Sequence, residues 1–295
     1  MPVIQTEQLT KRYGSERGLD GVSMAVIEGE VFGLLGPNGA GKTTMIRTLL
    51  DLLHPTAGRA SVFGLDSRRD SQAIRGRLGN LPGDFAFEPR LTGRELLLLF
   101  AALRGVDGLG RAEALAERFH ADLDRPLRHL SHGNRQKIGL IQALFHEPEL
   151  LVLDEPTGGL DPLMQEEFMR LVAEEREHGR TVFLSSHDLA EVERICDRVG
   201  IIREGRLVTV EEVAELTGKA YRHVSLELGD AVDPAEFESL PSVTDVEVSG
   251  RRVTFKAAGD IDPVVKAAAR HRVVDMELSH PSLEEIFVTY YEDGP

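Results

Sequence analysis

The sequence has 295 residues, a formal net charge of −15 and one cysteine, Cys196. This length is more than one hydrophobic core usually fills, so we expect a large domain and a smaller one. The acidic balance without a long basic run argues against a nucleic-acid partner, and a lone cysteine without a signal-peptide pattern indicates the cytoplasm.

The first elements are short β-type runs that lead into a glycine-rich loop. We predict strands at residues 3–6, 24–27 and 31–35, and a helix at residues 43–53 that ends near His54-Pro55. The opening of the chain therefore has the order strands, glycine loop, helix.

Residues 91–145 have helical patterning and no good strand candidate. Their longest apolar run, residues 96–103 (LLLLFAAL), is far shorter than the roughly 18 residues that cross a bilayer, and is typical of a buried helix. We predict a helical subdomain here and no direct insertion of the chain into a membrane.

Strand signals return after this helical stretch. The predicted strands are residues 150–153, 181–185 and 199–203, and they alternate with helices at residues 163–176 and 189–195. Alternation of this kind predicts a parallel α/β core, split around the helical insertion.

A second unit follows the turn at Glu204-Gly205 and a short helix that ends at Leu216. Its predicted elements are a strand at 224–228, a helix at 234–240, strands at 243–248 and 253–257, a helix at 264–269 and a strand at 273–278. This βαββαβ order is that of ferredoxin-like folds. We predict domains at residues 1–218 and 219–295, the second an acidic accessory or regulatory domain.

The most informative motif is GPNGAGKTT, which satisfies G-x-x-x-x-G-K-[ST] between a β-type run and a helix. In such a loop the backbone N–H groups and the helix N-terminus surround phosphate oxygens, Lys42 reaches the β and γ phosphates, and the Thr43 hydroxyl binds Mg²⁺. The predicted nucleotide-binding residues are Gly36, Pro37, Asn38, Gly39, Ala40, Gly41, Lys42, Thr43 and Thr44.

Two carboxylates follow the apolar run at residues 150–153. Asp154 and Glu155 would stand at the C-terminal end of a buried strand, where open α/β sheets bind ligands. We predict that Asp154 holds Mg²⁺ through water and that Glu155 polarises the attacking water as the general base. An apolar strand ending in Asp-Glu is common, so this prediction depends on the glycine loop.

The segment LSHGNRQ, residues 130–136, resembles the signature segment of ABC transporter ATPases and precedes the strand of Asp154. The resemblance implies that Ser131 and Gly133 close on ATP held by the glycine loop of a second subunit, in a head-to-tail homodimer. It also implies a RecA-like P-loop NTPase core with an antiparallel β subdomain. Ser131 can serve at the same time as the N-cap of the following helix.

Other positions of the ABC family match one by one. Residues 158–161 (GGLD) resemble the loop after the catalytic glutamate, which places Asp161 near nucleotide, and His187 lies like the switch histidine that contacts the γ-phosphate. Tyr13 matches the aromatic residue that stacks on adenine. The resemblance thus implies Lys42, Glu155 and His187 as catalytic residues, and Thr43 and Asp154 as metal ligands.

The sequence departs from the family pattern after Leu81-Pro82. Gly83 stands where the family usually has a glutamine that binds Mg²⁺ and senses the γ-phosphate, and Asp84 is a candidate substitute if Mg²⁺ screens its charge. The signature also carries His132 in place of its first glycine and Asn134 in place of its glutamine, while Ser131 and Gly133 are kept.

The ending PSLEEIF, residues 281–287, resembles the C-terminal extension of the drug- and polyketide-exporting branch, whose ABC-2 type permeases are separate chains. The resemblance implies an ATPase subunit peripheral on the inner face of the cell membrane through its permease, with the contact around residues 84–98. Two alternatives remain open, a soluble ABC protein of translation or repair and a non-hydrolysing nucleotide switch. Soluble ABC proteins of translation usually carry two ATPase units per chain, and those of DNA repair carry a long coiled-coil insertion.

Overall fold

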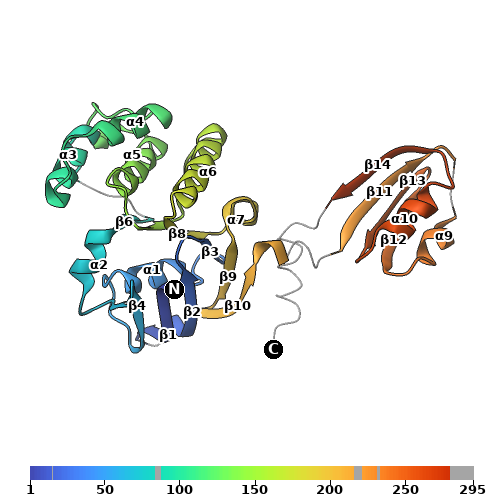
Figure 1. The fold of residues 1–295 in the computed structure, drawn as a ribbon, viewed down its shortest axis with the longest axis horizontal. Coiled ribbons are helices and arrows are strands. Elements are labelled where there is room, and N and C mark those ends of the chain that lie inside the picture. The colour runs from blue at the N-terminus through green and yellow to red at the C-terminus, as the bar shows by residue number, and fades with distance from the viewer. Residues whose placement is uncertain (15, 84–87, 216–220, 231–232, 280–295) are drawn as a thin grey trace. The chain divides into compact units, whose positions relative to one another are not determined.

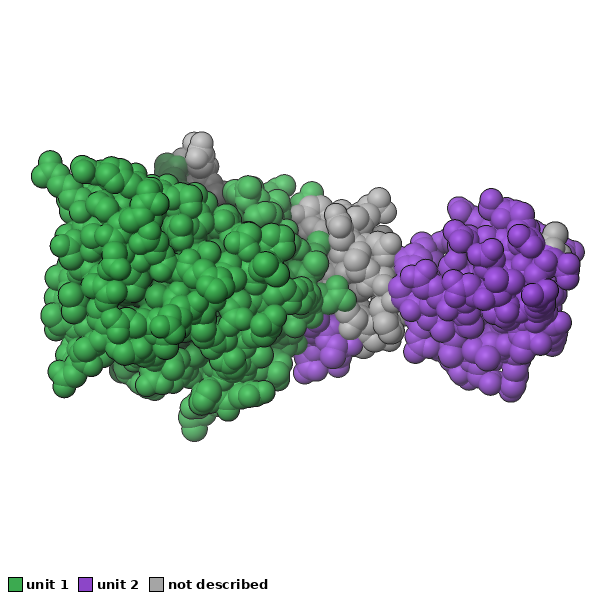
Figure 2. Space-filling view, turned by 90° about the horizontal axis from the view of Figure 1, so that it is seen from above, with its two compact units in different colours: residues 1–211 green, residues 212–295 purple. Residues whose placement is uncertain are grey.

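The computed structural model describes residues 1–14, 16–83, 88–215, 221–230 and 233–279. The chain forms two compact units, residues 1–211 and 212–295 (Figure 2). The domain boundary predicted at residues 218 and 219 lies outside the described residues.

An antiparallel sheet opens the first unit, in the order β2-β1-β4-β5. β1 (Pro2–Tyr13) pairs with β2 (Glu16–Ile27) and with β4 (Ala57–Val62), which pairs with β5 (Leu65–Asp66). β1 and β2 are much longer than predicted. Bulges between them break the simple alternation of polar and apolar residues, so the pattern shows only a fragment of each strand.

The second sheet has the order β10-β9-β3-β8-β7-β6 and contains the predicted parallel core. Its strands are β3 (Val31–Leu35), β6 (Leu78–Leu81), β7 (Leu150–Asp154), β8 (Thr181–Ser186), β9 (Arg198–Arg203) and β10 (Arg206–Glu212). Every residue of β3, β7 and β8 is buried, as expected for parallel strands covered on both faces. The carboxyl ends of these three strands lie at one edge of the sheet.

Helices α1 (Lys42–Leu49), α2 (Ser71–Arg77), α6 (Pro162–Glu177) and α7 (Leu189–Ile195) complete the core. The helix predicted at residues 43–53 is too long, because α1 ends at Leu49. The N–H groups of Leu52 and Leu53 both donate to the carbonyl of Arg47, and Asp51 has a positive φ of 58°. This backbone arrangement terminates the helix before His54-Pro55.

The predicted helical insertion is confirmed. It contains α3 (Gly93–Arg104), α4 (Gly110–Arg118), a 3₁₀ turn at Leu127–His129 and α5 (His132–Leu144), all on the side of the first unit away from β1, β2 and β4 (Figure 1). Thr92 begins α3 with a capping box, in which its side chain and that of Glu95 each accept a backbone N–H of the other residue. Arg118 of α4 pairs with Glu167 and Glu174 of α6, which ties the insertion to the core.

The second unit has the predicted βαββαβ order. Its elements are β11 (Arg222–Leu228), α9 (Pro234–Glu238), β12 (Val243–Ser249), β13 (Arg252–Ala257), α10 (Asp262–Ala268) and β14 (Val273–Ser279). The strands pair antiparallel in the order β12-β13-β11-β14, which is a ferredoxin-like sheet. Phe237 of α9 is fully buried and stacks on Phe255 of β13 at a centroid distance of 5.3 Å, in the centre of a separate core.

Candidate active site

The glycine loop joins the end of β3 to the start of α1, as the sequence predicts. Glycine is required at two of its positions by close backbone contacts. A Cβ on Gly36 would lie 2.3 Å from the carbonyl oxygen of Ile202, and Gly41 has a φ of 111° with the carbonyl oxygen of Gly18 2.5 Å from a Cβ position. The loop is therefore held in shape by β9 and β2, independently of any ligand.

Lys42 is buried at the base of this loop, with 5% of its surface exposed. Its Nζ donates to the carbonyl oxygens of Gly36 at 2.7 Å and Pro37 at 3.3 Å, and lies 3.3 Å from Oε1 of Glu155. The ammonium group is thus oriented inside the loop, at the position where it can neutralise phosphate oxygens.

Asp154 is the last residue of β7 and is 2% exposed. It is paired in the sheet with Ser185, whose hydroxyl donates to Oδ1 of Asp154 at 2.5 Å. The other carboxylate oxygen faces Gly83, where a Cβ would lie 3.0 Å from Oδ2. The departure from the family pattern at Gly83 therefore falls directly beside the predicted metal ligand, while Asp84 lies outside the described residues.

Glu155 has a left-handed backbone with a φ of 49°, which is rare for a residue with a side chain. Its N–H is shared between the carbonyl and the hydroxyl oxygens of Ser185, at 3.2 and 3.1 Å. Its Oε2 lies 3.2 Å from Nδ1 of His187, which follows β8 and is 56% exposed. One carboxylate therefore contacts both Lys42 and His187, and brings together three residues that are far apart in the sequence.

The signature segment forms the N-terminus of α5, where the Ser131 side chain accepts the N–H of Asn134 at 3.3 Å as the N-cap. Gly133 lies against the loop after Glu155, since a Cβ there would be 2.4 Å from the carbonyl oxygen of Gly159. Among the contacts of the described residues, none joins Ser131 or Gly133 to Lys42. The two halves of the predicted nucleotide site are thus separate within one chain.

Comparisons with known proteins agree with this arrangement. Residues 19–158 match the ABC transporter family. The bacitracin transport ATP-binding protein BcrA of Enterococcus faecalis is 36% identical over 292 residues, which cover 97% of this chain and 95% of that protein. This chain belongs to the ABC transporter ATP-binding proteins. It is an ATP-binding and ATP-hydrolysing subunit of that family.

Further similarities support the same assignment of this ABC ATPase. The daunorubicin resistance ATP-binding protein DrrA3 of Streptomyces coeruleorubidus is 37% identical over 299 residues, covering 97% of this chain and 94% of the relative. A solved ATP-binding subunit of an ABC transporter is 30% identical, with a TM-score of 0.66 over 72% of this chain and 91% of that one. The fold prediction of a P-loop NTPase core is confirmed.

Tyr13 stands at the end of β1 and is 44% exposed. A Cβ on Gly18 would lie 2.7 Å from Cε2 of Tyr13 and 3.1 Å from Cγ2 of Thr44, so the ring reaches the start of α1 across a glycine. An exposed aromatic face beside the glycine loop suits stacking on a purine. Its role in this ABC ATPase stays a prediction.

Asp161 lies at the start of α6, where its carboxylate accepts the N–H of Met164 at 3.1 Å. Its predicted contact with nucleotide therefore competes with a structural role as a helix N-cap.

In the part of the chain that the structure describes, no helix is long and apolar enough to span a bilayer.

The sequence reasoning assigned no role to two residues of this site. Ser185 belongs to the predicted strand at residues 181–185, and only the sheet register places its hydroxyl on Asp154. Gln136 is the last residue of the signature segment, and its amide contacts the backbone of Glu155. No periodicity or motif spacing reports contacts of this kind.

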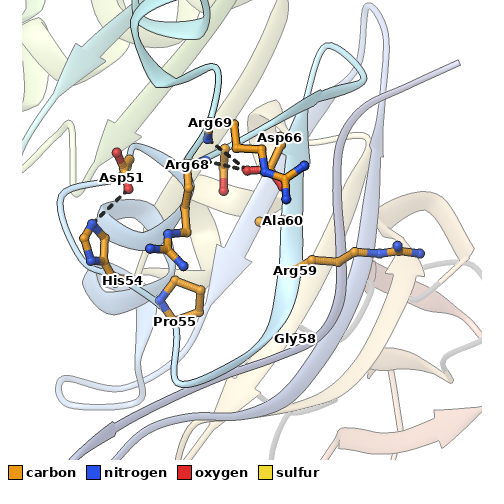
Figure 3. A pocket seen from close by; sticks show the side chains of 10 residues that line it. Asp51, His54, Pro55, Gly58, Arg59, Ala60, Asp66, Arg68 and Arg69 are labelled. Carbon is orange, nitrogen blue, oxygen red and sulfur yellow. Dashed lines mark hydrogen bonds and ion pairs between the residues drawn. The ribbon is translucent and has the colours of Figure 1, made fainter.

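A separate pocket of about 410 Å³ lies beside the end of α1 and β4 (Figure 3). It has an ion pair between Asp51 and His54 at 3.3 Å, and the Asp66 carboxylate accepts the N–H groups of Arg68 and Arg69. These two hydrogen bonds lower the pKa of Asp66. Its lining contains none of the predicted site residues.

Proposed function

We propose that this ABC ATPase binds ATP and Mg²⁺ between two copies of the chain and drives export through a separate membrane permease. The observation that carries the proposal is the contact of one carboxylate, Glu155, with both Lys42 and His187 at the end of the parallel sheet. A base beside the phosphate-binding lysine is the arrangement that water attack on a γ-phosphate requires.

The residues at this edge of the sheet fit Mg²⁺. A hydroxyl and a carboxylate, from Thr43 and Asp154, are hard oxygen donors of the kind this ion prefers. The described residues contain no group of three or more His, Cys, Asp or Glu side chains that could hold a metal ion, and Mg²⁺ commonly keeps several waters and binds substrate phosphates, so we propose that water and phosphate oxygens complete the coordination. Bound Mg²⁺ would neutralise charge on the phosphates. Ser185 holds the Asp154 carboxylate in place through a buried hydrogen bond.

Each side chain then has a defined task. ATP phosphates attract the Lys42 ammonium away from Glu155, which frees that carboxylate to accept a hydrogen bond from water. His187 lies within 3.2 Å of the other Glu155 oxygen and, because it is half exposed, can reach a γ-phosphate as well. Hydrolysis thus depends on holding water, carboxylate and phosphate in line.

The second half of each site comes from another copy in this proposal. Ser131 and Gly133 lie at the N-terminus of α5, where Ser131 is exposed and the first N–H groups of a helix have no partner within the helix, which suits a phosphate. Because no contact joins these groups to Lys42 among the described residues, we propose that a head-to-tail homodimer completes two sites.

We propose that the permease contact, which the sequence analysis expects around residues 84–98, includes the exposed leucines of α3. Leu98, Leu99 and Leu103 are 49%, 49% and 73% exposed, and Leu99 and Leu103, which are four residues apart, lie on one face of the helix. An apolar stripe of this kind on an otherwise charged protein marks an interaction surface. The relatives are named for bacitracin transport and daunorubicin resistance, which favours an exported cargo. In this proposal the protein is held peripherally at the inner face of the membrane.

The deciding experiment replaces Glu155 by Gln. Glu155→Gln keeps the size of the side chain but removes the base, so ATP hydrolysis should fall at least about a hundredfold while ATP binding is retained. Size-exclusion chromatography with ATP and Mg²⁺ should then show a trapped dimer, and Lys42→Ala should remain monomeric. Undiminished hydrolysis by Glu155→Gln would reject Glu155 as the base.

The alternative of a nucleotide switch without hydrolysis, which Gly83 beside Asp154 suggested, does not agree with membership of this ATPase family.

A further inference from the structure

The backbone of Glu155 is held from both sides by buried side chains. On one side, Ser185 accepts its N–H. On the other side, the amide Nε2 of Gln136 donates to the carbonyl oxygens of Glu155 and Pro156, each at 3.1 Å. Gln136 is 3% exposed, so water does not compete for these two bonds.

These bonds stabilise an unfavourable conformation. A φ of 49° costs a residue with a side chain free energy relative to the ordinary regions, and such strain persists only when neighbours hold it. If Glu155 relaxed to an ordinary φ, its carboxylate would leave Lys42 and His187. The hydrogen bonds from Gln136 therefore act on the direction in which the base points.

Gln136 also connects Glu155 to the signature segment, because it is the last residue of that segment and lies in the first turns of α5, of which Ser131 is the N-cap. The same end of α5 contacts the loop after Glu155 a second time, where His132 and Gly133 pack against Gly159. The start of α5 and residues 155–159 are thus joined at two places. If the start of α5 moves, residues 155–159 must move with it.

We propose that Gln136 is a positioning residue for Glu155, and that through it the signature segment of a subunit controls the base of that same subunit. This inference rests on the proposed shared-site dimer, in which Ser131 and Gly133 contact ATP on the other copy while Glu155 acts on ATP in its own glycine loop. Gln136 then makes each hydrolytic site respond to nucleotide at the opposite site.

The test compares two buried glutamines on the same helix. Gln136→Met keeps the side-chain volume but removes the amide donor, and kcat should fall about ten- to a hundredfold because the base is misplaced, with the Kd for ATP unchanged within about twofold. Gln142→Met is the matched control, since Gln142 is 4% exposed and has no contact with residues 155 and 156 among those described. It should keep kcat within about twofold.

Two further measurements separate positioning from general damage. In the Glu155→Gln background, adding Gln136→Met should leave the residual rate unchanged, because the base that Gln136 positions is already absent. The Hill coefficient for ATP should also fall towards 1 in Gln136→Met and not in Gln142→Met. If Gln136→Met does not fold, Gln136→Asn, which is one methylene too short for both carbonyls, replaces it.

The outcomes distinguish this inference from the proposed function. A full loss of activity in Glu155→Gln together with an unaltered kcat in Gln136→Met would overturn the role of Gln136 and leave the ATPase assignment intact. Equal losses in Gln136→Met and Gln142→Met would overturn it as well. Wild-type activity in Glu155→Gln would instead contradict the proposed function itself.

Discussion

At the residue scale, the site depends on side chains that the chain places in uncommon environments. Lys42 is a buried cation whose Nζ is satisfied by two loop carbonyls and one carboxylate, and Asp154 is a buried anion held by a serine hydroxyl. Burying a charge is costly unless it is hydrogen-bonded or paired. These contacts within the protein support the proposed binding of phosphate and Mg²⁺ at this site.

His146 provides a prediction at the same scale. It follows α5, and burial, with added repulsion from Arg104 and Arg180, lowers its pKa to about 4. Its Nε2 lies 3.3 Å from the carbonyl oxygen of Leu78, which can only accept, so Nε2 carries the hydrogen of a neutral ring.

In unfolded protein His146 binds a proton below a pKa of about 6.5, whereas the folded ring stays neutral down to about pH 4. The free energy of unfolding should therefore fall as the pH decreases from 6.5 towards 4, by at most ~1.4 kcal/mol per pH unit from this group. His146→Gln can still donate to Leu78 but does not titrate, so urea unfolding at pH 7 and pH 5 should show a smaller difference. An identical difference would contradict this assignment.

At the element scale, the helical insertion is a stable platform with one uncovered apolar face. The capping box at Thr92 and the ion pairs of Arg118 with α6 fix α3 and α4 to the core. Helices of a soluble domain normally turn such a face inward. The exposed leucines of α3 therefore support the proposed contact with the permease.

Leu99→Glu tests this face. Glutamate is a good helix former, so α3 should persist, but a charge in the centre of an apolar contact should oppose docking. We expect at least about a tenfold loss of protein that sediments with membranes of the cells that make it, with ATP hydrolysis by the isolated protein unchanged. The control is Val265→Glu on α10, because the Val265 side chain is also exposed, at 44%. Equal sedimentation of both variants would remove α3 as the contact.

At the scale of the whole molecule, each unit has a hydrophobic core of its own. Each could therefore lose its structure separately. We propose that the second unit is an accessory domain and that residues 1–218 suffice for ATP hydrolysis.

Phe237→Ala tests this independence in the full chain. Phe237 is fully buried, and removal of a buried phenylalanine ring costs about 3–5 kcal/mol. Calorimetry should show one transition moved to lower temperature or lost and the other unchanged, while ATP hydrolysis stays within about twofold. A single transition that moves as a whole would mean that the units unfold together.

Sequence patterns alone predict the glycine loop, the order of the parallel core, the helical insertion and the βαββαβ unit. These features are local, because glycine spacing, apolar runs and turn residues report the backbone directly. The residues of strands β1 and β2 were only partly predicted, since bulges interrupt their alternation.

The contacts that hold the site together follow from the three-dimensional fold. Lys42, Glu155 and His187 meet because three parallel strands end at one edge, and Ser185 reaches Asp154 because of the register between β7 and β8. The left-handed backbone of Glu155 and its hydrogen bonds from Gln136 have no counterpart in sequence periodicity. Contacts between residues distant in the chain depend on sheet order and register, which spacing along the sequence does not specify.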